Sequence, residues 1–153
     1  MVRRLCTAGY EVQIVATKNG FRFLNSDMIK FIQGKNINIW TDDSQWPDQK
    51  YTKNQEILHI SLGDWADLLL VAPLTADTLG KIARGACDNL LMSLVRAWHR
   101  DRPIILAPAM NTRMWEHPAT EIDLQQVKNW YDHVYVVGPI KKQFFYPLFF
   151  INF

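Results

Sequence analysis

The sequence is poor in cysteine and contains no long hydrophobic run, and each shortage excludes a class of protein. Its 153 residues include only Cys6 and Cys87, which are too few for a disulfide framework or a zinc site and favour a reducing compartment. No apolar stretch approaches the ~18–20 residues that a membrane-spanning helix needs. The start, residues 1–6, has no apolar signal-peptide core. We therefore expect a soluble, cytoplasmic protein with no membrane partner.

A strong charge of one sign is also missing. Lys and Arg together number 17 against 15 for Asp and Glu, and no long basic run occurs. This balance argues against nucleic acid or an anionic membrane as the main partner. Hydrophobic residues make up 48% of the chain, which is enough to bury a core, and the length fits a single domain.

Short apolar segments alternate with helical patterns along most of the chain. The strand candidates are residues 11–16, 36–40, 67–72, 103–107 and 133–137. The helix candidates are residues 75–84, 88–98 and 120–130. Residues 67–72 are almost wholly apolar and are closed by Pro73, as is typical of a strand buried on both faces. The alternation predicts an α/β fold: an open Rossmann-like, flavodoxin-type parallel sheet with helices on both faces.

Both ends of the chain depart from this pattern. Residues 2–8 predict a helix that leads directly into the strand at 11–16, so we expect the first, central strand and its phosphate-binding turn to be missing. We expect open strand edges where that strand would lie. Residues 144–153 contain six aromatic side chains with no alternation. The sequence thus predicts an N-terminally incomplete domain over 1–142 and a divergent aromatic tail over 143–153, from a fragment or an aberrant gene model.

Ligands of an open parallel sheet bind outside the carboxyl ends of its strands, which narrows the search for a site. Thr75, Asp77 and Thr78 follow one strand candidate and could bind a ligand through hydroxyls and the free N–H groups of a helix start. Thr75 or Asp77 could equally be an N-cap. Asn111 follows the next strand and has the same two interpretations, ligand-binding amide or cap. Spacing alone leaves both open.

Other candidate residues have ordinary packing interpretations. His59 lies among apolar residues, where a lone histidine is more often a packing residue than an acid or base. Met110, Met114 and Trp115 could form a flat apolar wall for an aromatic ligand, or merely core. No glycine-rich phosphate motif, zinc pattern or Ser–His–Asp arrangement is visible. The residue patterns alone therefore predict only an α/β ligand-binding domain.

Several blocks in a fixed order resemble the homo-oligomeric flavin-containing Cys decarboxylase family. The blocks are residues 58–62, 65–74, 75–83, 87–91, 96–98 and 108–115. The last block contains Pro108-Ala109-Met110-Asn111 and Met114-Trp115, which match the family's P-A-M-N-x-x-M-W signature without a mismatch. The resemblance runs from about Met1 to Lys142.

The resemblance implies an FMN-dependent carboxy-lyase of coenzyme A biosynthesis. In the implied reaction, FMN oxidises the cysteine thiol of 4′-phosphopantothenoylcysteine, the thioaldehyde loses carbon dioxide, and the enethiolate is reduced to 4′-phosphopantetheine. The flavin carries electrons out and back. Members of the family are trimers with FMN at the subunit contact, so a homotrimer is implied.

The resemblance also implies roles for individual residues. His59 matches the active-site histidine, Asn111 matches the residue that binds the substrate carboxylate, and Met114 lies on the same wall. Asp77 stands where the family usually has Asn. The residues that match flavin-contacting positions are Thr17, Lys18, Asn19, Phe23, Thr75, Ala76, Asp77, Thr78 and Ala109. No metal site is implied.

One departure leaves alternative functions open. After Lys142 the family continues into a loop with a Cys-Gly pair, whose cysteine protonates the enethiolate, and this chain has Gln143-Phe144 instead. The alternatives are a non-catalytic regulatory or mixed-trimer subunit and a flavin-dependent peptidyl-cysteine decarboxylase. The lack of an acidic tail argues against the first. The intact blocks at 96–98 and 114–115 argue against the second.

Overall fold

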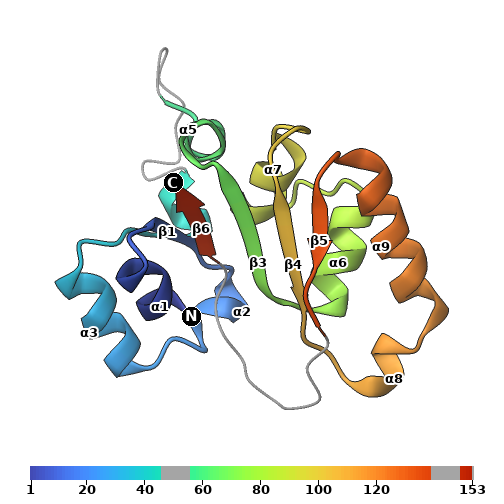
Figure 1. Ribbon diagram of the computed structural model, residues 1–153, viewed down its shortest axis with the longest axis horizontal. Helices are drawn as coiled ribbons and strands as arrows, with labels where there is room; N and C mark the ends of the chain where they lie inside the picture. Colours follow the sequence, from blue (N-terminus) through green and yellow to red (C-terminus); the bar gives the residue numbers. More distant parts are fainter. Residues whose placement is uncertain (46–55, 139–148, 153) are drawn as a thin grey trace.

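The computed structural model describes residues 1–45, 56–138 and 149–152 of the chain (Figure 1). The strands in these ranges are β1 (Glu11–Val15), β2 (Ile39–Trp40), β3 (Leu68–Leu74), β4 (Ile104–Pro108), β5 (Val134–Val136) and β6 (Phe149–Asn152). The helices are α1 (Val2–Thr7), α2 (Lys18–Phe21), α3 (Ser26–Gly34), α4 (Asp42–Gln45), α5 (Leu58–Trp65), α6 (Ala76–Ala83), α7 (Leu90–Arg96), α8 (Thr112–Trp115) and α9 (Pro118–Trp130).

The strands form one sheet in the order β2-β1-β6-β3-β4-β5. The pairs β1–β2, β3–β4 and β4–β5 are parallel, which confirms the expected α/β fold with an open Rossmann-like sheet. At the centre, β6 runs antiparallel to both of its neighbours, β1 and β3. The sequence did not predict this antiparallel strand.

The strand β6 fills the position for which the sequence predicted open edges. Asn152 lies opposite Glu11 on β1, and Phe149 lies opposite Leu70 on β3. The expectation of open edges between β1 and β3 is therefore wrong where β6 pairs with them. A strand at the centre of a covered sheet is apolar on both faces, which explains why this segment shows no alternation. The predicted boundary at residue 142 lies outside the described residues.

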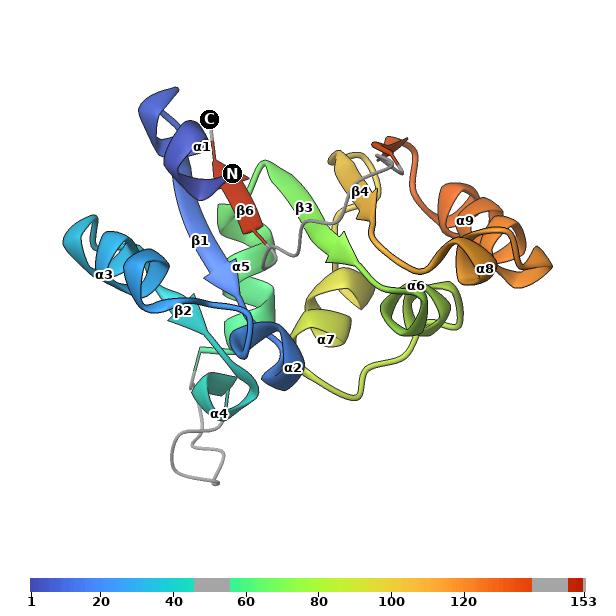
Figure 2. The ribbon, with the colours of Figure 1, turned by 90° about the horizontal axis from the view of Figure 1, so that it is seen from below.

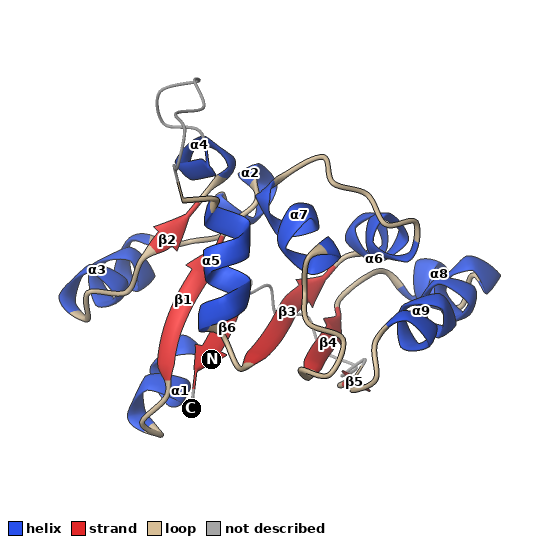
Figure 3. Ribbon diagram, turned by 90° about the horizontal axis from the view of Figure 1, so that it is seen from above, coloured by secondary structure: helices blue, strands red, loops and turns tan. Residues whose placement is uncertain are grey.

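Helices cover both faces of the sheet (Figure 3). On one face Leu68 and Leu70 of β3 belong to a hydrophobic cluster that includes residues of α1 and α3. On the other face Leu69 and Val71 belong to a larger cluster with residues of α5, α6, α7 and α9. β3 is thus buried on both sides, as its apolar sequence predicts.

Some element boundaries differ from the prediction for local reasons. β3 continues through Pro73 to Leu74, at a register shift between β3 and β4, where a missing N–H is tolerated. α9 begins at Pro118 rather than Thr120, with His117 as its N-cap. His117 Nδ1 accepts a 3.2 Å hydrogen bond from the N–H of Ala119, so the helix is capped before Thr120. Thr120 lies in its first turn, and its hydroxyl donates a 2.6 Å hydrogen bond to the carbonyl of Met114.

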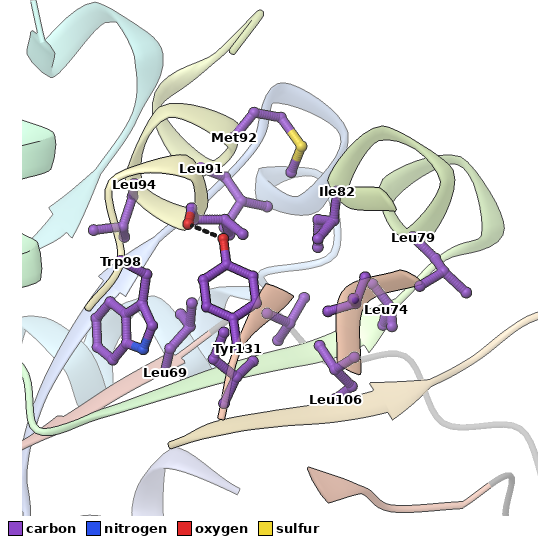
Figure 4. Close-up of a cluster of buried hydrophobic side chains, with 14 of the residues drawn as sticks. Leu69, Leu74, Leu79, Ile82, Leu91, Met92, Leu94, Trp98, Leu106 and Tyr131 are labelled. Atoms are coloured by element: carbon purple, nitrogen blue, oxygen red, sulfur yellow. Dashed lines mark hydrogen bonds between the residues drawn. The ribbon is translucent and has the colours of Figure 1, made fainter. Parts of the chain in front are cut away.

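The larger cluster also contains a buried polar contact (Figure 4). Tyr131 follows α9 and is 7% exposed, and its hydroxyl donates a 2.6 Å hydrogen bond to the carbonyl oxygen of Val95 in α7. Burial raises the pKa of the Tyr131 phenol, which favours the protonated form that can donate. This bond links α9 to α7 across the core.

We expect Tyr131→Phe to lower the free energy of unfolding by about 1 kcal/mol, the net value of one such hydrogen bond. Tyr135→Phe is the matched control, because Tyr135 is 55% exposed and its hydroxyl should contribute little. Urea denaturation of both variants measures the difference. An equal decrease in the free energy of unfolding of the two variants would show that the hydrogen bond to Val95 does not stabilise the protein.

Candidate functional site

Three of the expected site segments begin at the carboxyl ends of strands. Thr17 follows β1, Thr75 is the N-cap of α6 after β3, and Asn111 follows β4 (Figure 2). The backbone N–H of Ala109 donates a 2.9 Å hydrogen bond to the carbonyl of Leu74, which ties the ends of β3 and β4 together. The segments after β3 and β4 are therefore adjacent. The segment after β1 lies on the other side of β6.

Thr75 and Asn111 are both helix N-caps. The Thr75 hydroxyl accepts a 3.2 Å hydrogen bond from the N–H of Thr78, and Asn111 Oδ1 accepts a 2.9 Å bond from the N–H of Arg113. In the part of the chain that the structure describes, Asn111 Nδ2 has no hydrogen-bond partner, so it can still donate to a ligand. Met114, on the same short helix, is 49% exposed. Capping and ligand binding by Asn111 are thus compatible, because they use different atoms.

The acidic residue at the start of α6 forms an ion pair. Lys81 Nζ lies 3.4 Å from Asp77 Oδ2 and 3.0 Å from Asp88 Oδ2. Hydrogen bonds to Asp88 and Asp77 raise the pKa of Lys81. The positive charge of Lys81 therefore offsets the negative charge of Asp77 beside Ala76, the half-buried first residue of α6.

The residues after β1 form a separate, more exposed group. Thr17 caps α2 by accepting a 3.0 Å hydrogen bond from the N–H of Gly20. Lys18 and Asn19 are exposed, and Phe23 is 51% exposed. The structure does not bring this group into contact with the α6 and α8 group through any described hydrogen bond or ion pair.

His59, in α5, lies on the side of the sheet where the parallel strands have their carboxyl ends. This helix leads into the amino end of β3, so its first turn lies towards the carboxyl ends of the strands. His59 Nδ1 lies 3.2 Å from the amide nitrogen of Gln45 in α4. An amide NH₂ group can only donate, so Nδ1 accepts and the neutral ring carries its proton on Nε2. Burial lowers the pKa of His59 below its ordinary value of 6.5, which also favours this neutral form.

Two residues that hold α5 or the ring of His59 carried no signal in the sequence. Arg102 Nη1 donates hydrogen bonds of 2.8, 3.0 and 2.8 Å to the carbonyls of Gly63, Asp64 and Ala66, and so binds the end of α5. Gln45 binds the ring of His59 itself. These partners are distant in sequence, so no local motif could reveal them.

Two described cavities lie away from the residues expected to form the site. One, of about 470 Å³, is lined by residues of the outer face of α5, including Ile57, Ile60 and Asp64. The other, of about 410 Å³, lies near the amino ends of β1 and β2 and includes Cys6 and Trp65. Neither cavity is lined by Thr75, Asn111 or His59.

Comparison with known proteins identifies the family. Residues 1–146 match the family model described as Flavoprotein. The chain belongs to the flavoprotein family. This flavoprotein shares 45% identity over 117 residues with phosphopantothenoylcysteine decarboxylase of Oryza sativa subsp. japonica, covering 76% of this chain and 51% of that relative. The chain spans between 51% and 68% of the length of three curated relatives.

Solved structures of related proteins have the same fold. A cysteine-to-serine mutant of PPC decarboxylase, complexed with pantothenoylaminoethenethiol, is 38% identical with a TM-score of 0.80, over 97% of this chain and 80% of that one. The FMN binding protein AtHal3 is 35% identical with a TM-score of 0.74, over 89% and 73%. The FMN-dependent cysteine decarboxylase TvaF of thioviridamide biosynthesis is 30% identical with a TM-score of 0.66, over 83% and 71%.

The described part of this flavoprotein shows neither a membrane span nor a metal cluster. None of its helices is long and apolar enough to cross a membrane. No group of three or more His, Cys, Asp or Glu side chains is placed there to hold a metal ion.

The lowered pKa of His59 predicts a pH dependence of stability. As the pH falls through about 6.5, the unfolded chain takes up a proton that native His59 resists, so the free energy of unfolding should fall. His59→Asn should remove this part of the decrease between about pH 7.5 and about pH 5. His133→Asn, which removes an exposed imidazole, is the control. An unchanged slope in His59→Asn, measured by urea denaturation, would contradict the prediction.

Proposed function

We propose that this flavoprotein catalyses the FMN-dependent decarboxylation of 4′-phosphopantothenoylcysteine to 4′-phosphopantetheine, a step of coenzyme A biosynthesis. The observation that carries the proposal is the segment at residues 108–115. It places the Asn111 amide at the end of β4, bonded through Ala109 to the end of β3. The names of the relatives support this substrate. The higher identity to PPC decarboxylase than to TvaF favours it over a peptide substrate.

The polar groups at this edge fit a flavin mononucleotide. The start of α6 offers backbone N–H groups and the hydroxyl of Thr78, and the edge near β1 offers the apolar ring of Phe23. The residues that would hold FMN are Thr17, Lys18, Asn19, Phe23, Thr75, Ala76, Asp77, Thr78 and Ala109. When bound, FMN supplies the two-electron oxidation and reduction.

Two side chains would act on the substrate. His59 in its neutral form has a proton on Nε2 to give and, once it has given it, a nitrogen that can accept one. Asn111 Nδ2, which has no hydrogen-bond partner among the described residues, is a donor for the substrate carboxylate, and the exposed Met114 is on the same helix. Binding and proton transfer are thus assigned to different elements, α8 and α5.

The resemblance to the decarboxylase family supports a homotrimer with FMN at the subunit interface. A flavin needs a concave site that covers most of its surface, and neither of the two cavities described above is lined by the residues that would hold FMN. In the proposed trimer a neighbouring subunit would cover part of the flavin. We place the reaction in the cytoplasm, as the low cysteine content predicts.

We expect the purified protein to bind FMN and become yellow, because the start of α6 keeps its N–H groups and hydroxyls at the ligand edge. Gel filtration followed by the absorbance spectrum of the protein peak measures bound flavin and assembly together. A folded trimer that stays colourless with added FMN would contradict the proposal.

We expect His59→Asn to keep FMN and lose most turnover, since removing a positioned acid or base costs ~10²–10⁴-fold. Product formation is followed by mass spectrometry of 4′-phosphopantetheine, and flavin content is measured on the same sample. Near-normal turnover would assign His59 to packing alone.

We expect Asn111→Asp to lose activity while keeping the fold. Aspartate can still cap α8, because its carboxylate accepts the N–H of Arg113, but it places a negative charge against the substrate carboxylate. Asn129→Asp adds the same charge near the end of α9, and should leave turnover unchanged. Equal activity in the two variants would show that Asn111 does not bind the carboxylate.

A further inference from the structure

The short helix α4 contacts two other helices through two of its side chains. Asp42 and Gln45 are three residues apart, a spacing that puts both on the same side of a helical turn. Asp42 Oδ1 accepts a 2.8 Å hydrogen bond from the N–H of Leu90, the first residue of α7. Gln45 Nε2 lies 3.2 Å from His59 Nδ1 in α5. The helix α4 therefore joins the start of α7 to the ring of His59 (Figure 3).

The bond from Asp42 satisfies a backbone group at the start of α7. The N-cap of α7 is Asn89, whose side chain accepts the N–H of Met92 at 2.9 Å. The N–H of Leu90 needs a different acceptor, because the first N–H groups of a helix have none inside the helix. The carboxylate of Asp42 supplies it, and a hydrogen bond to an ionised group is stronger than one between neutral groups. This contact holds α4 against a helix 48 positions further along the chain.

The start of α4 is fixed to the sheet. Ser44 Oγ accepts a 3.0 Å hydrogen bond from the N–H of Thr41, and the N–H of Ser44 donates a 2.9 Å bond back to the Thr41 carbonyl. Thr41 directly follows β2, where the carbonyl of Trp40 accepts the N–H of Ala16 at 2.8 Å. The sheet on one side and α7 on the other thus set the position of Gln45.

We propose that Gln45 is a positioning residue that fixes the tautomer of His59, and that Asp42 holds the helix from which Gln45 acts. A neutral imidazole has one nitrogen that donates and one that accepts, and the hydrogen-bond partner decides which is which. The NH₂ group of Gln45 can only donate, so His59 Nδ1 accepts and Nε2 keeps the proton. The catalytic consequence rests on the function proposed above, in which His59 gives the proton on Nε2. The tautomer itself does not depend on that function.

The amide of Gln45 matters because it donates and carries no charge. A carboxylate in its place could only accept, so it would bind a proton on Nδ1 of His59 and leave Nε2 without one. Its negative charge would also raise the pKa of His59, opposing the lowering by burial. Exchanging the amide for a carboxylate should therefore reverse the tautomer and raise the pKa together.

The other charged groups on the helices around His59 are exposed or have partners of their own. In and beside α4, α5 and α7 they are Asp42, Asp43, Glu56, Asp64 and Arg96. Asp42 binds Leu90, Asp64 Oδ1 lies 3.0 Å from His99 Nε2, and Arg96 donates to the carbonyl of Gly85. Asp43 and Glu56 are exposed. Burial is the cause of the lowered pKa of His59, so a new charge at residue 45 would act directly on the ring.

Gln45→Glu tests the tautomer, because it exchanges the amide for a carboxylate of the same length. In the full chain labelled with ¹⁵N-histidine, the NMR shifts of the ring nitrogens distinguish a protonated from an unprotonated nitrogen, and His59→Asn identifies the His59 signals. At about pH 8, above the ordinary pKa of histidine, we expect the proton on Nε2 in the parent and on Nδ1 in Gln45→Glu. We also expect the pKa of His59 to rise by about 1 unit or more in this variant.

The matched control is Gln33→Glu, which makes the same exchange at an exposed position of α3. It should leave the tautomer and the pKa of His59 unchanged. Asp42→Ala removes the acceptor for Leu90 and should give a mixture of the two tautomers, whereas Asp42→Asn keeps an accepting oxygen and should retain the parent tautomer.

Two results would overturn the role of Gln45: a proton on Nδ1 in the parent, or the same tautomer and pKa in the parent and in Gln45→Glu. The parent tautomer alone in Asp42→Ala would overturn the role of Asp42.

Turnover separates this inference from the proposed function. If His59 is the acid or base, the pH midpoint of 4′-phosphopantetheine formation should rise in Gln45→Glu together with the pKa of His59. A midpoint that stays in place while the tautomer reverses would support the role of Gln45 and overturn the catalytic role of His59. A parent protein without turnover would overturn the proposed function alone, because the NMR measurement needs no product.

Discussion

The structure depends on the requirement that both edges of β3 be paired inside a core that excludes water on both faces. A buried backbone group without a partner costs ~1–3 kcal/mol, and a whole domain of this size is stable by only ~5–15 kcal/mol. The edge towards β4 is paired in parallel and the edge towards the centre by β6. Because β3 is paired on both sides, the start of α6, which follows β3 directly, has a fixed position.

The candidate site is built from the segments after the strands rather than from the strands themselves. Thr75 and Asn111 are the N-caps of α6 and α8. Each therefore uses its side-chain oxygen to accept a backbone N–H from the start of its helix. Among the described residues, capping leaves Asn111 Nδ2 for a ligand. The Thr78 hydroxyl accepts a 3.0 Å hydrogen bond from the Thr75 hydroxyl and can still donate its own proton. His59 lies on α5, whose far end is fixed by Arg102, whereas Asn111 begins α8, so different elements support the two residues.

The parts of the fold predicted well are those governed by local patterns. The apolar run after Asp67 predicted β3, and the turn chemistry at Thr75 predicted the start of α6, because burial on both faces and N-capping leave clear signals in neighbouring residues. The predicted start of α9 was two residues late, since His117 caps the helix and Pro118 begins it. The C-terminal segment, residues 143–153, was predicted to be a divergent aromatic tail. This segment does not alternate between polar and apolar residues, as expected of a central strand that is covered on both faces. Its own sequence does not indicate which strands will lie on either side of it.

By itself the sequence determined the α/β class, the strand and helix segments, and the family to which the chain belongs, because these depend on periodicity, caps and short contiguous motifs. It also determined that Thr17, Thr75 and Asn111 lie at the carboxyl edge of the sheet, since each of them comes directly after a strand segment. Only the tertiary structure decided that Gln45 binds His59, that Arg102 holds α5, and that Phe149–Asn152 pairs between β1 and β3. Those contacts join residues far apart in the chain. Pairing at that distance depends on which backbone edges and polar groups remain unsatisfied once the rest has folded.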